Sequence, residues 1–314
     1  MVKNKDFFER KKAVVFLNLV QKITSMVSIS NLVAGTMYWG QWGKSMSTKE
    51  MCRLIEFYQE QGVSTFDHAD IYGGYTMEAA FGHAFQMSSV ARGQVQFVSK
   101  CGIQYLSENR PNEVIHYDTS RAYITASAEA SLRHLQTDYL DTLLIHRPSP
   151  SMHPEEVMMA AEQLKKEGKI LHFGVSNFLP SQMDLMLSEG VLDINQIEFS
   201  VIRHNALFDG TLDRMIQHNI VPMAWGPLRS YYELKDYNQK NRLKHEFSKL
   251  CIKYNCTEDQ LLLAWILKHP SQIHPIIGTT KTDRIESALQ ALSIELSTEG
   301  WFKILVAAQG HDVP

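Results

Sequence analysis

Short apolar segments rich in β-branched residues recur eight times along the chain, and each is followed by a segment with the apolar spacing of a helix. Strands whose residues are almost all apolar are typical of a parallel sheet that is covered on both faces. The pattern therefore predicts buried parallel strands joined by helices. The predicted strands are residues 32–37, 63–67, 95–100, 140–146, 170–176, 194–197, 220–224 and 273–277.

Several segments between these strands begin with helix-start signals. Ser47 and Glu50 form a capping box, in which each side chain bonds the backbone N–H of the other residue. Thr257 and Gln260 form a second box ahead of an apolar run. Further helix starts or ends are predicted at Pro154, Pro180, Thr282, Gly168 and Gly190.

Strands that alternate with helices, without a Pro/Gly-rich linker, predict an α/β fold, a (β/α)8 TIM barrel that forms a single domain. A doubly wound dinucleotide-binding sheet would carry a Gly-x-Gly-x-x-Gly turn, and the sequence has none. We assign residues 19–314 to the barrel and residues 1–18 to a dispensable N-terminal extension. The extension has the basic and apolar parts of a signal peptide, but Asn18 interrupts the apolar run and no Ala-x-Ala site follows.

Composition excludes several other classes of protein. Hydrophobic residues make up 44% and charged residues 21% of the chain, a balance typical of globular proteins. With 31 basic and 34 acidic residues the net charge is −3, so we expect no nucleic-acid partner. No run approaches the roughly 18 apolar residues of a membrane helix, so we expect no membrane partner.

Cysteine usage indicates the compartment. Cys52, Cys101, Cys251 and Cys256 form no CxxC pair and are too few for a disulfide framework. We therefore expect a cytoplasmic protein with reduced thiols. The sequence contains no heptad repeat, so a monomer is the expected state.

Polar residues end three consecutive predicted strands. In a (β/α)8 barrel the active site lies at the C-terminal ends of the strands, where the βα loops converge. Asp67, Lys100 and His146 occupy these ends, and Tyr72 lies in the loop after Asp67. A phenol with a pKa near 10 is a poor acid at neutral pH unless a cation stabilises its phenolate. The four residues predict proton transfer by Tyr72, assisted by Lys100 and its partner Asp67, with His146 orienting a substrate oxygen.

Six motifs occur in this order along the chain: FDHADIYGGYTMEAAFG, VSKCGI, LLIHRPSP, HFGVSNF, PMAW and PIIGTTKTDRI. In sequence, order and spacing they resemble the motifs of the aldo-keto reductase superfamily, and most of all those of its bacterial YdhF-type oxidoreductases. The resemblance covers about residues 19–314. It implies an enzyme that uses NADPH, with NADH as a possible alternative, to reduce a small aldehyde or ketone. Matched by motif, Asp67, Tyr72, Lys100 and His146 correspond to the catalytic tetrad of that family, with Tyr72 as the general acid.

The same resemblance implies the residues that bind the cofactor. Ser176, Asn177 and Gln196 would bind the nicotinamide carboxamide, and Trp225 would stack on the ring. Gly35, Thr36 and Met37 would lie near the nicotinamide ribose. Gly226, Pro227 and Leu228 would flank the pyrophosphate. The adenosine phosphate would be bound by Gly278, Thr279, Thr280, Lys281 and Arg284.

Two positions depart from the pattern of the family. Many members have lysine at the position of Gly278 and tyrosine at the position of Trp225. Indole also presents a flat π face, so the second change is mild. The first leaves Arg284, helped by Lys281, to recognise the 2′-phosphate, and the preference between NADPH and NADH stays open.

Other interpretations of the chain belong to different functional classes. An NADPH-binding sensor with little turnover would share the cofactor residues. A metal-dependent barrel hydrolase would use His68, Asp70 and His153 as ligands, although the sequence has no His-x-His motif. Cys101, beside Lys100, is either a thiol of lowered pKa or a packing residue.

Aromatic residues predict the substrate pocket. Their rings are consistent with an apolar aldehyde or ketone, and the long segment 226–241 is expected to act as a flap over the cofactor. The pocket residues expected from the sequence are Tyr38, Trp39, Trp42, Tyr231 and Tyr232.

Overall fold

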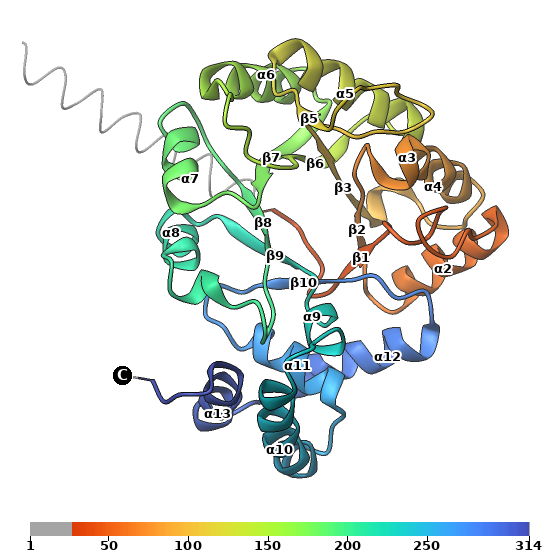
Figure 1. Ribbon diagram of the computed structural model, residues 1–314. Coiled ribbons are helices and arrows are strands. Elements are labelled where there is room, and N and C mark those ends of the chain that lie inside the picture. The colour runs from red at the N-terminus through yellow and green to blue at the C-terminus, as the bar shows by residue number, and fades with distance from the viewer. Residues whose placement is uncertain (1–26, 314) are drawn as a thin grey trace, which may run out of the picture.

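The computed structural model describes residues 27–313, and its core is a closed barrel of eight parallel strands (Figure 1). All eight strands predicted from the apolar segments are confirmed, with no end shifted by more than two residues. They are β1 (Val33–Gly35), β2 (Thr65–Asp67), β3 (Gln96–Cys101), β6 (Leu140–Ile145), β7 (Ile170–Ser176), β8 (Ile194–Glu198), β9 (Val221–Trp225) and β10 (His274–Ile277). Neighbouring strands in the sequence are neighbours in the barrel, which closes where β1 pairs with β10. The predicted (β/α)8 fold is therefore confirmed.

Helices surround the barrel, and α10 and α13 pack against each other outside this ring (Figure 1). The helices are α2 (Thr48–Glu60), α3 (Tyr72–Tyr75), α4 (Met77–Gln86), α5 (Arg121–Leu135), α6 (Pro154–Lys166), α7 (Pro180–Leu187), α8 (Thr211–His218), α9 (Arg229–Tyr232), α10 (Tyr237–Tyr254), α11 (Glu258–Leu267), α12 (Thr282–Gln290) and α13 (Thr298–Gln309). Short 3-10 turns span Arg92–Gln94, Asn205–Leu207 and Ala291–Ser293.

The predicted capping residues explain where two of these helices begin. Ser47 and Glu50 bond each other's backbone at the start of α2, and the buried face of that helix is apolar. At the start of α11, Gln260 accepts from the backbone N–H of Thr257 at 3.0 Å, while the Thr257 hydroxyl bonds Asp259 and does not cap the helix. These bonds to the backbone satisfy N–H groups that the first turn of a helix leaves free.

Apolar side chains fill the inside of the barrel and the layer between strands and helices. The inner cluster consists of Val33, Val98, Leu144, Ile194, Met223 and Ile276. Val27 and Ile29, which precede β1, pack against it. The chain ahead of the first strand therefore contributes to the core. The proposed extension 1–18 lies outside the described residues.

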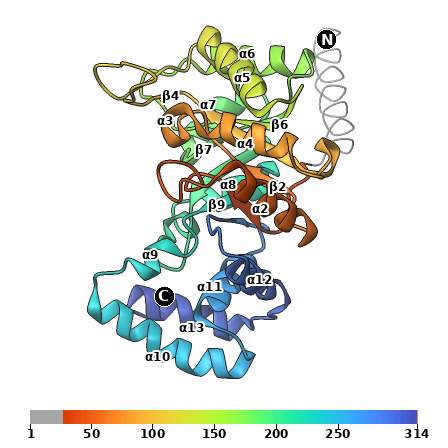
Figure 2. The ribbon, with the colours of Figure 1, turned by 90° about the vertical axis from the view of Figure 1, so that its right-hand side faces the viewer.

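One element was not predicted from the sequence. Between β3 and α5 the chain forms an antiparallel hairpin of β4 (Ile103–Gln104) and β5 (His116–Tyr117). Figure 2 shows this excursion on the same side of the barrel as α9. In residues 27–313 no helix is long and apolar enough to cross a membrane.

Candidate active site

Four elements bring the predicted tetrad together at one end of the barrel. Asp67 ends β2, Lys100 lies near the end of β3, and His146 follows β6 directly. Tyr72 begins α3, the short helix after β2. Because parallel strands of a barrel end on the same side, these side chains converge, and all four are buried. We call Asp67, Tyr72, Lys100 and His146 the tetrad corner.

The ammonium group of Lys100 is the centre of this corner. Its Nζ lies 2.8 Å from each carboxylate oxygen of Asp67. It also donates to the backbone oxygen of His68 at 2.6 Å and lies 3.2 Å from the hydroxyl of Tyr72. Only 1% of the Lys100 side chain is exposed, so an unpaired ammonium would be costly there. The corner is therefore a fixed, charge-balanced group.

Burial and charge act in opposite directions on these groups. Burial alone would lower the pKa of Lys100, but Asp67 and Tyr72 outweigh it and raise that pKa. Burial raises the pKa of Tyr72, and the Lys100 ammonium opposes this effect without reversing it. The predicted direction of the lysine's influence is correct, but the net lowering of the Tyr72 pKa is not found. Tyr72 is thus a protonated phenol at neutral pH.

His146 is a neutral imidazole beside the phenol. Burial lowers its pKa well below the usual range, and the charges of Lys100 and Arg147 act in the same direction. The rings of His146 and Tyr72 lie 6.1 Å apart, edge to face. Nδ1 of His146 is buried and has no hydrogen-bond partner within the described part of the chain. The ring therefore has hydrogen-bonding capacity that the protein leaves unused.

The candidate carboxamide residues are linked to the tetrad corner by hydrogen bonds. Gln196 on β8 donates from Nε2 to Asp67 at 2.7 Å. Ser176 donates to the backbone oxygen of Gln196 at 2.9 Å and accepts from Asn177 at 2.8 Å. The indole N–H of Trp225 reaches Asn177 Oδ1 at 2.9 Å. A continuous chain of polar groups thus runs from Asp67 to Trp225, and the backbone φ of Asn177 is +62° within it.

Two of the three residues expected near the ribose are buried at the end of β1. The hydroxyl of Thr36 donates to the backbone oxygen of Asp67 at 3.0 Å and lies 3.0 Å from His68 Nδ1. Gly35 is buried so closely that a Cβ there would lie 2.9 Å from Ile276 Cγ2. The Thr36 side chain thus links the ends of β1 and β2, and Gly35 allows close packing of β1 against β10. Met37 is half-buried.

The remaining candidate cofactor residues lie in the loops after β9 and β10. Gly226 has a φ of +66° and no atom within 4 Å of where a Cβ would stand. Pro227 is buried and Leu228 half-buried. Gly278 is exposed, and Thr279 holds its loop by accepting a bond from Tyr58 at 2.7 Å. Thr280 follows and is half-buried.

Two cations stand at the start of α12 without anionic partners. Lys281 and Arg284 are exposed, and their side chains form no hydrogen bond or ion pair with other described residues. The first N–H groups of a helix are free to bind an anion. We call Gly226, Gly278, Lys281 and Arg284 the cofactor rim.

The aromatic residues expected in the substrate pocket separate into two groups. Trp39 is fully buried among Tyr58, Phe66 and Phe81, so it belongs to the core and its assignment to the pocket is wrong. Tyr231 is also core: it is 2% exposed and its hydroxyl donates to Glu258 at 2.8 Å.

Three aromatic candidates keep some accessible surface. Trp42 packs edge-on against Tyr72 at 6.3 Å. Tyr38 accepts a bond from Arg229 of α9 at 3.3 Å, so the segment expected to act as a flap touches the loop after β1. Tyr232 is 57% exposed on α9. Sequence reasoning missed Tyr105, which packs on Trp42 at 5.2 Å and comes from the β4–β5 excursion.

The residues of the other two chemical interpretations, a reactive thiol and a metal site, lie in environments that favour neither. Burial raises the pKa of Cys101 well above its usual value, which makes it a packing residue and not a reactive thiol. His68 is enclosed by Phe81 and Phe97. Over residues 27–313, no three His, Cys, Asp or Glu side chains are grouped to hold a metal ion.

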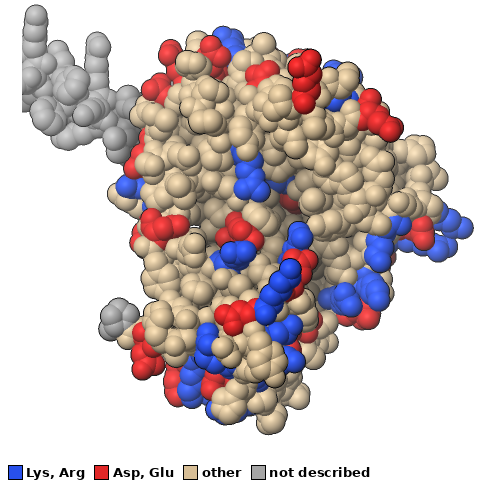
Figure 3. Space-filling model, in the orientation of Figure 1, with Lys and Arg blue, Asp and Glu red and all other residues tan. Residues whose placement is uncertain are grey.

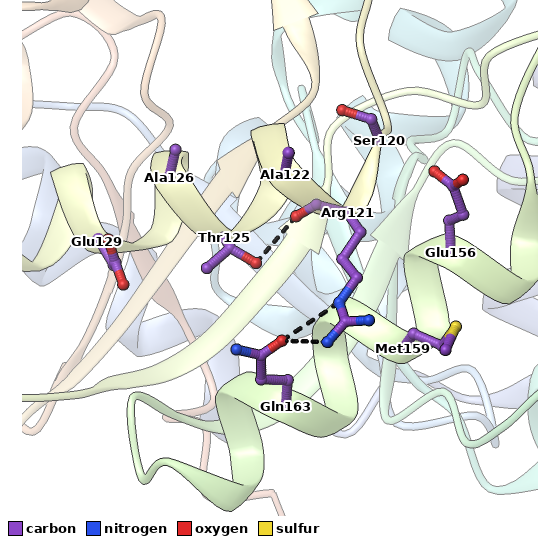
Figure 4. Close-up of a pocket in the computed structure, with 9 residues that line it drawn as sticks. All are labelled: Ser120, Arg121, Ala122, Thr125, Ala126, Glu129, Glu156, Met159 and Gln163. Atoms are coloured by element: carbon purple, nitrogen blue, oxygen red, sulfur yellow. Dashed lines mark hydrogen bonds between the residues drawn. The ribbon is translucent and has the colours of Figure 1, made fainter.

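The tetrad corner is separate from another depression on the molecule. In Figure 3, which has the orientation of Figure 1, the face is hollowed near its centre and Lys and Arg side chains border the hollow. A second cavity, of about 650 Å³, lies between α5 and α6 on the outer layer (Figure 4). There Gln163 accepts two bonds from Arg121, at 3.2 and 2.6 Å, and no tetrad residue contributes. The predicted catalytic residues therefore lie at the barrel end and away from this outer cavity.

Comparisons with known proteins agree with this geometry. The model of the aldo/keto reductase family matches residues 31–305. Oxidoreductase YdhF of Escherichia coli is 42% identical, over 94% of this chain and 100% of its own. The uncharacterized oxidoreductase YcsN of Bacillus subtilis is 41% identical, over 92% and 97% of the two chains. An aldo-keto reductase of Klebsiella pneumoniae, solved in complex with NADPH, is 25% identical with a TM-score of 0.73, over 91% of this chain and 92% of its own.

Proposed function

Because the chain belongs to the aldo/keto reductase family and is an oxidoreductase, we propose that it uses NADPH to reduce an aldehyde or a ketone to an alcohol. One observation carries the proposal beyond family membership. The buried ammonium of Lys100 contacts both the Asp67 carboxylate and the Tyr72 hydroxyl. This arrangement prepares a phenol for proton transfer and has no comparable use in a purely structural barrel.

The residues at the barrel end fit NADPH. The space around Gly226 and the open surface at Gly278 allow a ligand backbone to approach closely. Lys281 and Arg284 offer unpaired cations for the 2′-phosphate, at the start of α12. Trp225, held by Asn177, offers a flat face for the nicotinamide. When bound there, NADPH supplies the hydride for the carbonyl carbon.

Tyr72 is the general acid in this proposal. As negative charge develops on the carbonyl oxygen, the Tyr72 hydroxyl donates its proton to that oxygen. The Lys100 ammonium, 3.2 Å from the phenol oxygen, stabilises the phenolate that remains. Asp67 keeps Lys100 charged and in place. His146 is neutral and can donate one hydrogen bond to the same carbonyl oxygen, which orients it for the proton.

An assay of purified protein with NADPH and an aldehyde tests the proposal. Falling absorbance of NADPH that depends on the aldehyde is the expected result. Bound NADPH without turnover would instead support a sensor, and turnover that is lost with a chelator would support a metal enzyme. Either of these outcomes would overturn the reductase proposal.

A further inference from the structure

An arginine beside the tetrad corner has no anionic partner among residues 27–313. Arg147 follows His146 directly, and its guanidinium carbon lies 5.5 Å from the centroid of the Trp225 ring. Its half-buried side chain therefore reaches from the end of β6 toward the end of β9, across the mouth of the barrel. Apart from this ring contact, it forms no hydrogen bond or ion pair in residues 27–313.

Other cations in the neighbouring loops are neutralised within the protein. Arg203, after β8, lies 3.8 Å from Glu198. Arg229, after β9, is bound by Glu233 at 2.9 Å. Lys100 is paired with Asp67. Lys281 and Arg284 are unpaired, but they stand at the cofactor rim on α12. Arg147 thus adds an uncompensated positive charge next to the tetrad corner itself.

The surroundings of Arg147 indicate what would neutralise it. A guanidinium is a planar fork that matches the two oxygens of a carboxylate or a phosphate. Its contact with indole leaves the N–H groups at the edge of the fork free. His146, its neighbour, is neutral and cannot balance the charge. A ligand anion is the remaining partner for this charge.

We propose that Arg147 binds an oxyanion of the substrate, so that the enzyme reduces carbonyl compounds that carry a carboxylate or a phosphate group. The inference rests on the reductase function proposed above and names its substrate class. The carbonyl lies at Tyr72 and His146, the carbon chain packs against Trp42 and Tyr105, and the oxyanion meets Arg147. The substrate proposed here thus differs from the apolar carbonyl compound expected from the aromatic residues, because it also carries an anionic group.

The substrate explains Arg147 better than the cofactor does. The cations available for cofactor phosphate are at the start of α12, after β10. Arg147 instead extends from the strand that positions His146, and it contacts Trp225, where the nicotinamide, which has no phosphate, is proposed to stack. A phosphate of NADPH therefore has nearer partners than Arg147.

Matched pairs of carbonyl compounds test the inference. We would compare kcat/KM for 4-oxobutanoate and its methyl ester, and for glyceraldehyde 3-phosphate and glyceraldehyde. We expect the wild type to prefer the anionic member of one pair by about 10- to 100-fold, as charge-assisted hydrogen bonds allow. The preferred pair tells whether the oxyanion is a carboxylate or a phosphate.

Two variants and a control locate the effect. Arg147→Met should abolish the preference, mainly through KM, and leave the neutral compound and the dissociation constant of NADPH nearly unchanged. Arg147→Lys should keep part of the preference, since it retains the charge but not the fork. Arg203→Met removes a paired arginine after β8 and should keep the full preference. A wild type without preference, or a preference that survives Arg147→Met, would overturn the inference. So would an equal loss for NADPH, which would assign Arg147 to the cofactor.

A binding experiment separates this inference from the reductase proposal. Calorimetry of the protein loaded with NADP⁺ would measure the affinity for succinate and for glycerol 3-phosphate. We expect one of them to bind, and to bind about tenfold or more weakly to Arg147→Met. Binding without reduction of any carbonyl would refute only the reductase function. If neither anion binds, or if Arg147→Met binds as well as the wild type, the anion site does not exist.

Discussion

The tetrad corner and the cofactor rim differ in whether their cations are paired within the described protein. In the corner, Lys100 is 1% exposed and already bonded to Asp67 and Tyr72. At the rim, Lys281 and Arg284 are exposed and have no partner in the described protein. The corner is therefore organised before any ligand arrives, and its geometry is available for the reaction step. The positive charge at the rim is available to a ligand, so we expect its residues to control affinity and not rate.

Tyr72→Phe is the strongest test of the corner. The variant keeps the ring packed against Trp42 but removes the hydroxyl that we propose as the proton donor. Since this proton is needed only as charge develops on the substrate oxygen, we expect kcat to fall by about 10²-fold or more. The dissociation constant of NADPH should stay nearly constant. Steady-state kinetics and cofactor titration measure the two effects.

An exposed tyrosine gives the matched control for this variant. Tyr237 is 75% exposed at the start of α10, so Tyr237→Phe should leave kcat unchanged. If Tyr72→Phe also turned over at the wild-type rate, Tyr72 would not be the acid.

Lys100→Met should affect both rate and stability, because one side chain serves both in the corner. The substitution leaves the buried Asp67 carboxylate with Gln196 as its remaining side-chain partner. Removing one member of a buried ion pair costs about 3–5 kcal/mol of folding free energy. The cation that favours the phenolate is also lost, so the pKa of Tyr72 should rise and the pH–rate profile should shift to higher pH. Denaturant unfolding and a pH–rate profile provide the two readouts.

Asp67→Asn offers a milder comparison at the same ion pair. It keeps an oxygen that can accept from Lys100, and Lys100 keeps its contacts with His68 and Tyr72. A loss of activity greater than that of Lys100→Met would show that the carboxylate, and not the ammonium, is the essential charge.

Arg284→Ala tests the rim, where only affinity should change. Its guanidinium stands at the start of α12 and is expected to hold the 2′-phosphate of NADPH. Charge-assisted hydrogen bonds contribute about 1.5–3 kcal/mol, so NADPH should bind roughly 10- to 150-fold more weakly. NADH lacks this phosphate and should bind as before. Dissociation constants for both cofactors at fixed salt measure the difference.

Lys281→Ala provides the internal reference at the rim. An exposed ammonium is a solvated point charge, so it should act in the same direction as Arg284→Ala with a smaller effect. Equal losses for NADPH and NADH in Arg284→Ala would contradict recognition of the 2′-phosphate and would indicate relaxed cofactor specificity.

The same contrast explains how far the sequence could predict the molecule. The barrel strands are buried on both faces, so each was visible as an apolar run, and Asp67 and Lys100 were visible as polar ends of such runs. The β4–β5 hairpin has strands of two residues each, which leave no periodic signal. Trp39 was misassigned because an aromatic residue near a strand end fits either a core or a pocket, and only the direction of its side chain decides.

Long-range polar contacts were also beyond the sequence. Whether an arginine is paired depends on residues that the fold brings near, so Arg147 looked no different from Arg203. The bond from Gln196 to Asp67 joins residues 129 positions apart. Patterns along the chain predicted which elements form, but not which polar atoms meet between them.

The final prediction concerns stability alone and involves Asp70, which supports the loop between Asp67 and Tyr72. Its Oδ2 accepts bonds from Ser127 at 3.1 Å and Tyr123 at 3.2 Å, and its Oδ1 is buried without a partner in residues 27–313. The pKa of Asp70 is raised to about 7, chiefly by burial and also by the charge of Glu78, while Arg110 and the two hydroxyl groups oppose the rise. Cys101, which also packs near this carboxyl, has a raised pKa and stays neutral.

The raised pKa of Asp70 predicts a pH dependence of stability with a definite sign. A carboxyl with a folded-state pKa above its unfolded value of 3.8 stabilises the fold below that value and loses the contribution as pH rises through 7. Asp70→Asn cannot ionise but still accepts from Ser127 and Tyr123, so it should match the wild type near pH 4. By pH 8 it should be more stable, by at most about 4 kcal/mol, since one pKa unit corresponds to about 1.36 kcal/mol. Thermal melts between pH 4 and 8 measure this divergence. Asp138→Asn, an exposed control, should follow the wild-type curve. Curves for Asp70→Asn and the wild type that stay parallel across the range would show that the pKa of Asp70 is not raised in the folded protein, and that the carboxyl is already ionised there like the charges of the corner.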